Sequence, residues 1–286
     1  MTLTIAHLGP PGTYAEQAAF FYLNWLKTHQ GIEAELSPYP TIARSLQAVA
    51  NQQVQLAVVP VENSIEGSVS MTMDTLWQLD SLSIRLALIL PIAHTLISYA
   101  PDLESIQTVY SHPQALAQCQ EWLAQFLPNA TLIPSNSTTE ALQRLPQETS
   151  TAAIASKRAA ELYNLPILAS GINDYPENRT RFWVISPAGS DVNLSLSAPS
   201  HTSLACSLPA NVPGALVKLL QVFAQLGINM SRIESRPTKR SLGEYLFFID
   251  VEAETRSPLM QFALSELSKY TEVLKVFGSY SVLPIT

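Results

Sequence analysis

Asn178-Arg179-Thr180-Arg181-Phe182-Trp183-Val184-Ile185 is the stretch in which a polar loop with two arginines passes directly into an apolar strand. A strand holds such polar side chains at the edge of a sheet, where their heads are free to meet a ligand. If the alternation of a strand already applies, Arg179 and Arg181 lie on the same side. One of them could then pair with a carboxylate beside the hydroxyl of Thr180. Taken alone, the stretch fits a small-anion site and an ordinary strand with two solvated arginines equally well.

The chain before this stretch alternates short apolar runs with amphipathic segments, which is typical of an α/β domain with mostly parallel strands. Residues 56–61 form a near-continuous apolar run, as expected of a strand covered on both faces. A strong helix is predicted over 113–127, and 83–97 is predicted to be strand folded back near Pro91. The other predicted strands are 3–8, 34–39, 107–110, 131–134, 152–155, 165–169 and 180–186, with helices over 13–28, 42–51, 138–144 and 156–163.

A second, smaller domain follows the α/β series. Residues 187–202 are rich in Ser, Ala, Gly, Pro and Asn and lack a hydrophobic period, so they are interpreted as a linker. Beyond it we predict strands over 204–208, 228–233, 245–251 and 273–280 and helices over 213–226 and 258–270. This βαββαβ order is the ferredoxin-like plan. The expected domains are therefore 1–186 and 203–283, joined by 187–202.

Composition narrows the classes of protein to which the chain can belong. Its 286 residues suit about two domains, and 47% hydrophobic residues suffice for two buried cores. No segment has the length of a membrane span or the pattern of a signal peptide, so we expect a cytoplasmic protein with no membrane partner. A net charge of −7 argues against nucleic acid. Cys119 and Cys206 stand far apart and no metal-ligand spacing occurs, which predicts reduced, buried thiols and no metal site.

Several short motifs resemble those of prephenate dehydratases, enzymes of phenylalanine biosynthesis. In that family a Thr-Arg-Phe motif carries an essential threonine, which corresponds to Thr180 here. The other matching segments are Gly9-Pro10-Pro11-Gly12-Thr13-Tyr14, Val59-Pro60-Val61-Glu62-Asn63-Ser64-Ile65-Glu66-Gly67-Ser68 and Tyr110-Ser111-His112-Pro113-Gln114. The resemblance covers almost the whole chain. It implies a catalytic domain of two α/β lobes around a cleft, as in periplasmic binding proteins, with chain crossings near 75–85 and 170–180.

The same resemblance implies a lyase reaction in which prephenate loses carbon dioxide and water to give phenylpyruvate, without a cofactor. Thr180 would donate a hydrogen bond to the departing hydroxyl, Arg181 would balance the charge of the substrate, and Phe182 would fix Thr180 by packing. Asn63 and Glu62 are the other catalytic candidates, and the Glu62 carboxyl could act as an acid or simply pair with an arginine. The candidates for substrate binding are Thr13, Ser64, Ser111, His112, Gln118, Ser137 and Thr138. For His112, which precedes a proline, a structural role is equally open.

The tail resembles the ACT regulatory domain of the same enzymes. This resemblance implies feedback by L-phenylalanine in a homodimer or homotetramer. The amino acid would bind between two segments of different chains, Gly214, Ala215, Leu216 and Val217 of one and Glu234, Ser235, Arg236 and Pro237 of the other. Two alternatives stay open, an arogenate dehydratase and an amino-acid-binding sensor without catalysis. The Thr180-Arg181-Phe182 motif discriminates against the sensor, because simple binding does not require it.

Overall fold

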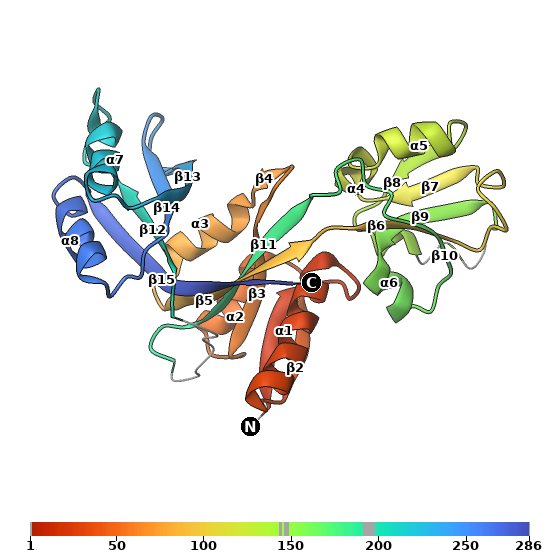
Figure 1. The fold of residues 1–286 in the computed structure, drawn as a ribbon, viewed down its shortest axis with the longest axis horizontal. Coiled ribbons are helices and arrows are strands. Elements are labelled where there is room, and N and C mark those ends of the chain that lie inside the picture. The colour runs from red at the N-terminus through yellow and green to blue at the C-terminus, as the bar shows by residue number, and fades with distance from the viewer. Residues whose placement is uncertain (1, 143–144, 146–148, 191–197, 286) are drawn as a thin grey trace.

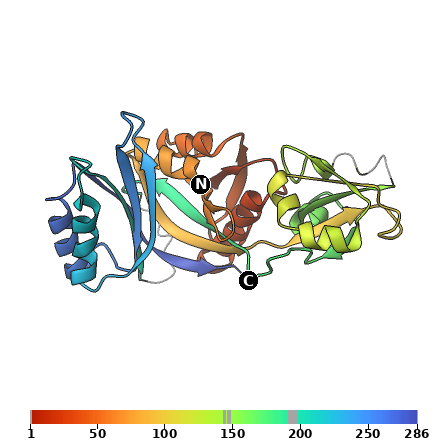
Figure 2. The ribbon, with the colours of Figure 1, turned by 90° about the horizontal axis from the view of Figure 1, so that it is seen from above.

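The computed structural model describes residues 2–142, 145, 149–190 and 198–285 and arranges the chain as three bodies in a row (Figure 1). A first α/β lobe lies in the middle, a second α/β lobe lies at one end, and the C-terminal domain lies at the other. The view from above in Figure 2 shows the same linear order. The fold class expected from the sequence, two α/β lobes followed by a smaller domain, is confirmed.

The first lobe is a mixed sheet covered by helices on both faces. Its elements are β1 (Leu3–Leu8), α1 (Tyr14–Gln30), β2 (Ala34–Tyr39), α2 (Ile42–Ala50), β3 (Leu56–Asn63), β4 (Gly67–Ser68), α3 (Ser70–Gln78), β5 (Leu82–Pro91) and β11 (Arg179–Pro187). Strand β3 is buried on both sides, because Val58 packs in the cluster with α1 and Val59 in the cluster with α2 and α3. Strand β11 runs antiparallel between β3 and β5. This pairing sets Thr180, at the start of β11, opposite Asn63, at the end of β3.

The second lobe is a five-stranded sheet in the order β10-β6-β9-β7-β8. Its elements are β6 (His94–Ser98), β7 (Thr108–Ser111), α4 (Pro113–Ala117), α5 (Gln120–Phe126), β8 (Thr131–Pro134), β9 (Thr151–Ser156), α6 (Lys157–Leu162) and β10 (Ile167–Ser170). The first crossing between the lobes lies at 91–94 and not near 75–85, because β5 stays in the sheet of the first lobe through Pro91. The return crossing, between β10 and β11, falls within the predicted 170–180 range.

The single helix predicted over 113–127 is wrong, because the chain breaks it at Gln118 and Cys119. Asp174, from the return crossing, stabilises the break. Its carboxylate accepts hydrogen bonds from the amides of Glu121 and Trp122, both at 3.1 Å, and its own amide donates to the Gln118 carbonyl at 2.9 Å. The helix predicted over 138–144 lies partly on residues outside those described, and its described part includes a 3₁₀ turn at 141–142.

The C-terminal domain has the predicted βαββαβ order. Its elements are β12 (His201–Ser207), α7 (Ala215–Gln225), β13 (Met230–Pro237), β14 (Tyr245–Val251), α8 (Pro258–Leu267) and β15 (Val273–Pro284). Strand β15 is longer than predicted, and its end, Ser281–Pro284, pairs in parallel with Leu86–Ile89 of β5. The domain and the first lobe therefore share one ten-stranded sheet. No helix among the described residues is long and apolar enough to cross a membrane.

The first lobe and the C-terminal domain are in direct contact, and the segment between them is not a free linker along its whole length. Of the predicted linker, 187–202, residues 191–197 lie outside the described residues, while its two ends belong to β11 and β12. One hydrophobic cluster contains Phe248 and Phe277 of the C-terminal domain together with Met73 and Trp183 of the first lobe. The two parts consequently share a core as well as a sheet.

Candidate active site

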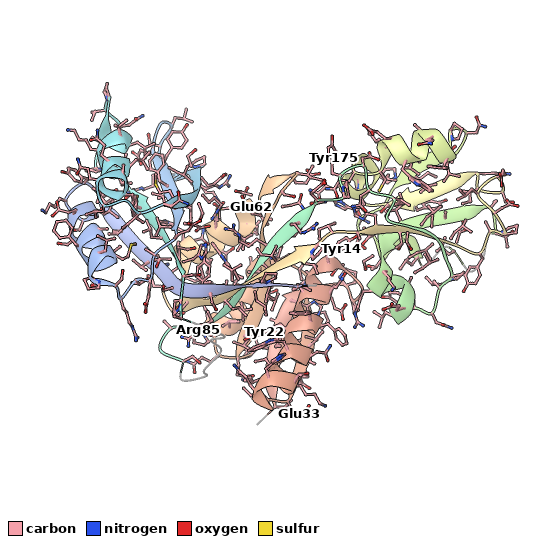
Figure 3. All side chains as sticks on the ribbon, viewed as in Figure 1. Tyr14, Tyr22, Glu33, Glu62, Arg85 and Tyr175 are labelled. Atoms are coloured by element: carbon pink, nitrogen blue, oxygen red, sulfur yellow. The ribbon has the colours of Figure 1, made fainter. Side chains whose placement is uncertain are left out.

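A cavity of about 710 Å³ lies at the junction of the two lobes. Its volume falls in the range of roughly 300–1,000 Å³ that is typical of small-molecule sites. Eight of the predicted site residues line it, namely Thr13, Asn63, His112, Gln118, Ser137, Thr138, Thr180 and Phe182. Tyr14 also lines the cavity, and Figure 3 shows this tyrosine where the first lobe meets the second.

Thr180 is held in the wall of this cavity by the sheet. The pairing of β11 with β3 brings the Asn63 side chain beside it, and Asn63 Nδ2 donates a hydrogen bond to Thr180 Oγ1 at 2.9 Å. Phe182, two residues along the strand, also lines the cavity, and its ring packs in the cluster that contains α1. With 8% of its surface exposed, Thr180 is nearly buried but reaches the cavity. These contacts hold the Thr180 side chain in the wall of the cavity.

Two of the predicted catalytic residues, Arg181 and Glu62, lie outside the cavity. Alternate residues of a strand point to opposite faces, so Arg181 faces away from Thr180 and Phe182. Its Nη1 lies 3.2 Å from Asp250 Oδ2 of the C-terminal domain and 3.7 Å from Glu62 Oε2. Figure 3 shows Glu62 on the side of the first lobe that faces that domain. The expectation that Arg181 balances the charge of the substrate is therefore corrected: its charge is matched by carboxylates of the protein.

Ser111 and Ser64, expected to bind substrate, also lie outside the cavity. Ser111 is fully buried, and its hydroxyl donates to the carbonyl of Ile154 at 2.6 Å. Ser64 joins the ends of two strands, since its hydroxyl accepts from the Arg179 amide at 3.0 Å. Its own amide donates to the Arg179 carbonyl at 2.9 Å. Both serine side chains therefore stabilise the backbone of neighbouring strands and do not face the cavity.

Four polar residues that were not singled out from the sequence belong to the site. Tyr14, Glu66 and His94 line the cavity, and Asn178 lies just beneath it, 1% exposed. Tyr14 and Glu66 stand within motifs that resemble those of the family, and Asn178 opens the stretch 178–185, but the sequence indicated no role for any of the three. The sequence did not indicate a functional role for His94, because this residue lies in an apolar run that is typical of a buried strand.

The cavity is lined by polar side chains that include one carboxylate, that of Glu66. None of the described residues that line it is an arginine or a lysine. Burial lowers the pKa of His94, against a smaller opposing effect of its hydrogen bond with Gln118. Burial also lowers the pKa of His112, which Glu66 opposes by its charge. An anion in this cavity would be met by hydroxyls, amides and the positive end of helix α1, which begins beside Thr13.

Direct contacts between the lobes fix the width of the cavity. Arg158 of the second lobe binds Glu16 of α1 through two hydrogen bonds, of 2.8 and 3.1 Å, and its guanidinium stacks on Phe20. Ser156 donates to the Gly12 carbonyl at 3.0 Å. Within the ranges that the structure covers, no cluster of three or more His, Cys, Asp or Glu side chains is placed to hold a metal ion.

The two segments expected to bind phenylalanine occupy different parts of the C-terminal domain. Gly214 has a φ of 81°, in the left-handed region that favours glycine, and immediately precedes helix α7. Glu234 and Arg236 lie on β13 and face the first lobe, where Glu234 accepts a hydrogen bond from Ser68 and Arg236 binds both carboxylate oxygens of Asp74. Strand β13 thus touches β4 and α3 directly.

Comparison with known proteins agrees with this architecture. The family model for prephenate dehydratase matches residues 5–190, and the ACT domain model matches residues 202–261. The chain is 41% identical to a bifunctional chorismate mutase/prephenate dehydratase of Neisseria gonorrhoeae, over 97% of this chain and 74% of that protein. It is 37% identical to a prephenate dehydratase of Methanocaldococcus jannaschii, over 99% of both.

A solved structure gives the same result for the fold. The prephenate dehydratase of Arthrobacter aurescens, in complex with L-Phe, superposes with a TM-score of 0.85 at 32% identity, covering 98% of this chain and 90% of that one. The motif Thr180-Arg181-Phe182 falls inside the region that the first family model matches. The chain belongs to the prephenate dehydratase family.

Proposed function

We propose that this protein converts prephenate into phenylpyruvate, carbon dioxide and water. The observation that carries the proposal is the position of Thr180, whose hydroxyl reaches the cavity between the lobes and accepts a hydrogen bond from Asn63. A hydroxyl at this point can donate a hydrogen bond to a departing oxygen. The family to which the chain belongs supports the same reaction.

For this reaction the protein has to orient the substrate and donate hydrogen bonds to it. The ring carboxylate leaves as carbon dioxide, and the electron pair of its bond completes the aromatic ring. The ring hydroxyl departs and takes up one proton to form water. Charge therefore develops on the departing oxygen, and a fixed donor beside that oxygen stabilises the transition state more than the ground state. We assign this donor to Thr180, with Asn63 and Gln118 orienting the substrate.

We further propose that L-phenylalanine binds the C-terminal domain and lowers activity. Its route to the active site would be β13, because Glu234 and Arg236 contact Ser68 and Asp74 of the first lobe. Ser68 lies five residues from Asn63 along the chain. The regulatory site would lie between two chains, which calls for a homodimer or homotetramer acting in the cytoplasm.

Turnover by the purified protein tests the proposal. We expect phenylpyruvate to form from prephenate in the presence of a chelator, with one proton consumed per turnover. Arogenate is assayed in parallel, with phenylalanine as its product, and faster turnover of arogenate would transfer the assignment to arogenate dehydratase. Binding of prephenate without consumption would instead support a sensor and overturn the proposed activity.

A further inference from the structure

A chain of hydrogen bonds between side chains runs beneath the cavity, and its direction can be read from the backbone. It starts at Asn63, whose Oδ1 accepts from the backbone amides of Ile65 and Glu66 at 2.9 and 3.0 Å. Backbone amides only donate, so these two bonds fix which end of the Asn63 carboxamide is oxygen. The Nδ2 group therefore faces the other way, where it donates to Thr180 Oγ1 at 2.9 Å and to Asn178 Oδ1 at 2.8 Å.

The same direction continues from Asn178 into the second lobe. With Oδ1 of Asn178 accepting, its Nδ2 donates to Gln118 Oε1 at 2.9 Å. The other end of Gln118, Nε2, donates to the carboxylate of Glu66 at 3.1 Å. His94 Nε2 lies 3.0 Å from Gln118 Oε1, an oxygen that cannot donate, so Nε2 carries the proton. In the neutral imidazole Nδ1 is then an acceptor. The Tyr14 hydroxyl lies 2.8 Å from this nitrogen and 2.9 Å from the Ala93 carbonyl, so two acceptors share the Tyr14 proton.

This direction has a consequence for Thr180. Its oxygen accepts from Asn63, so its own proton is not used in that bond. The residues described by the structure offer this proton no acceptor at hydrogen-bond distance, while the side chain lines the cavity. A hydroxyl that accepts a hydrogen bond also becomes a better donor, because bonds in a chain polarise one another. The Thr180 proton is thus left for a ligand oxygen.

We propose that Asn178 and His94 are positioning residues for the Thr180 hydroxyl. Both donate to Gln118 Oε1 and fix that carboxamide, and Asn178 Oδ1 accepts from Asn63 Nδ2, which keeps Asn63 beside Thr180 and leaves the Thr180 proton for the cavity. The inference rests on the proposed function. Asn178 connects the two lobes, because its side chain accepts a hydrogen bond from Asn63 of the first lobe and donates one to Gln118 of the second. The chain is complete only when the two lobes stand as they do here, so lobe closure and the orientation of Thr180 are coupled.

The test is a double-mutant cycle on kcat for prephenate. Asn178→Asp keeps the size of the side chain but replaces the donor that faces Gln118 with an acceptor. We expect kcat to fall about 10- to 100-fold, as for small misplacements of catalytic groups, with KM changed less than about threefold. In a Thr180→Ala background the same substitution should cost clearly less in kcat, because the part of the effect that Asn178 exerts through Thr180 is already lost. Equal losses in the two backgrounds would overturn the inference.

Asn173→Asp is the matched control. Asn173 is another asparagine at a lobe crossing, but its side chain binds only backbone, the His94 amide at 2.6 Å and the Ile92 carbonyl at 2.9 Å. Any loss of kcat that it causes should be the same in both backgrounds. If Asn178→Asp does not fold, Asn178→Ser shortens the side chain and breaks the link between Asn63 and Gln118 without adding a charge, and its loss of kcat should likewise be smaller in the Thr180→Ala background. Absence of turnover by the wild type would refute the proposed function, whereas additive losses in an active enzyme refute only the positioning roles.

Discussion

Asp250→Asn should destabilise the whole protein, because Asp250 holds two arginines from different parts of the chain. Its carboxylate lies 2.9 Å from Arg232 Nε and 3.2 Å from Arg181 Nη1, and it accepts from Ser203 at 2.6 Å. The side chain of Asp250 is 1% exposed and that of Arg232 is 5% exposed. Removal of one partner from a buried ion pair costs about 3–5 kcal/mol, since the remaining charges lose their compensation. For a protein of this size the Tm should fall by roughly 6 to 20 °C.

The assay is thermal unfolding followed by circular dichroism, with Asp80→Asn as the matched control. Asp80 forms an ion pair of similar length with Lys275, 2.8 Å, but its side chain is 93% exposed. Water and salt screen such a pair, so this variant should unfold close to the wild-type Tm. If the two variants shift the Tm by the same small amount, the buried pair does not join the C-terminal domain to β11 in the way inferred from the distances.

Three further predictions follow from the charges and burial of the described residues. The cavity is lined by no described arginine or lysine, so KM for prephenate should change less than about twofold between low salt and about 0.5 M salt, and a steep rise would reveal a cationic contact. Burial raises the pKa of both cysteine thiols to about 12, so a thiol reagent at pH 8 should label neither until the protein is unfolded, as titration in the presence and absence of denaturant will show. Burial lowers the pKa of four histidines in the folded state, namely His7, His94, His112 and His201, so the unfolded chain takes up protons first as the pH falls below about 6.5. The Tm should therefore drop on acidification from about pH 7 to about pH 5.5. Replacement of these four histidines by glutamine should make that drop smaller.

Sequence patterns predicted most helices and strands, but they did not predict toward which part of the molecule individual side chains point. The motif around Thr180 identified the strand that lines the cavity, and strand alternation places Arg181 on the face opposite Thr180. The motif could not show which face meets the cavity, or that the C-terminal domain covers the other face. Local pattern also favoured one long helix over 113–127, whereas Asp174, more than fifty residues away in the chain, stabilises the break. His94 lies in an apolar strand, and only the fold brings Gln118 and Tyr14 to its ring.

The most direct test of the account is the rate of phenylpyruvate formation by the wild type and by Thr180→Ala, with Thr180→Ser beside them. We expect the wild type to turn over prephenate and the alanine variant to lose about a hundred- to a thousandfold in kcat, the usual effect of removing one donor to a developing charge. The serine variant, which keeps the hydroxyl, should retain most of the activity, and the three proteins should bind prephenate with similar affinity. A folded Thr180→Ala variant with wild-type kcat would contradict the account.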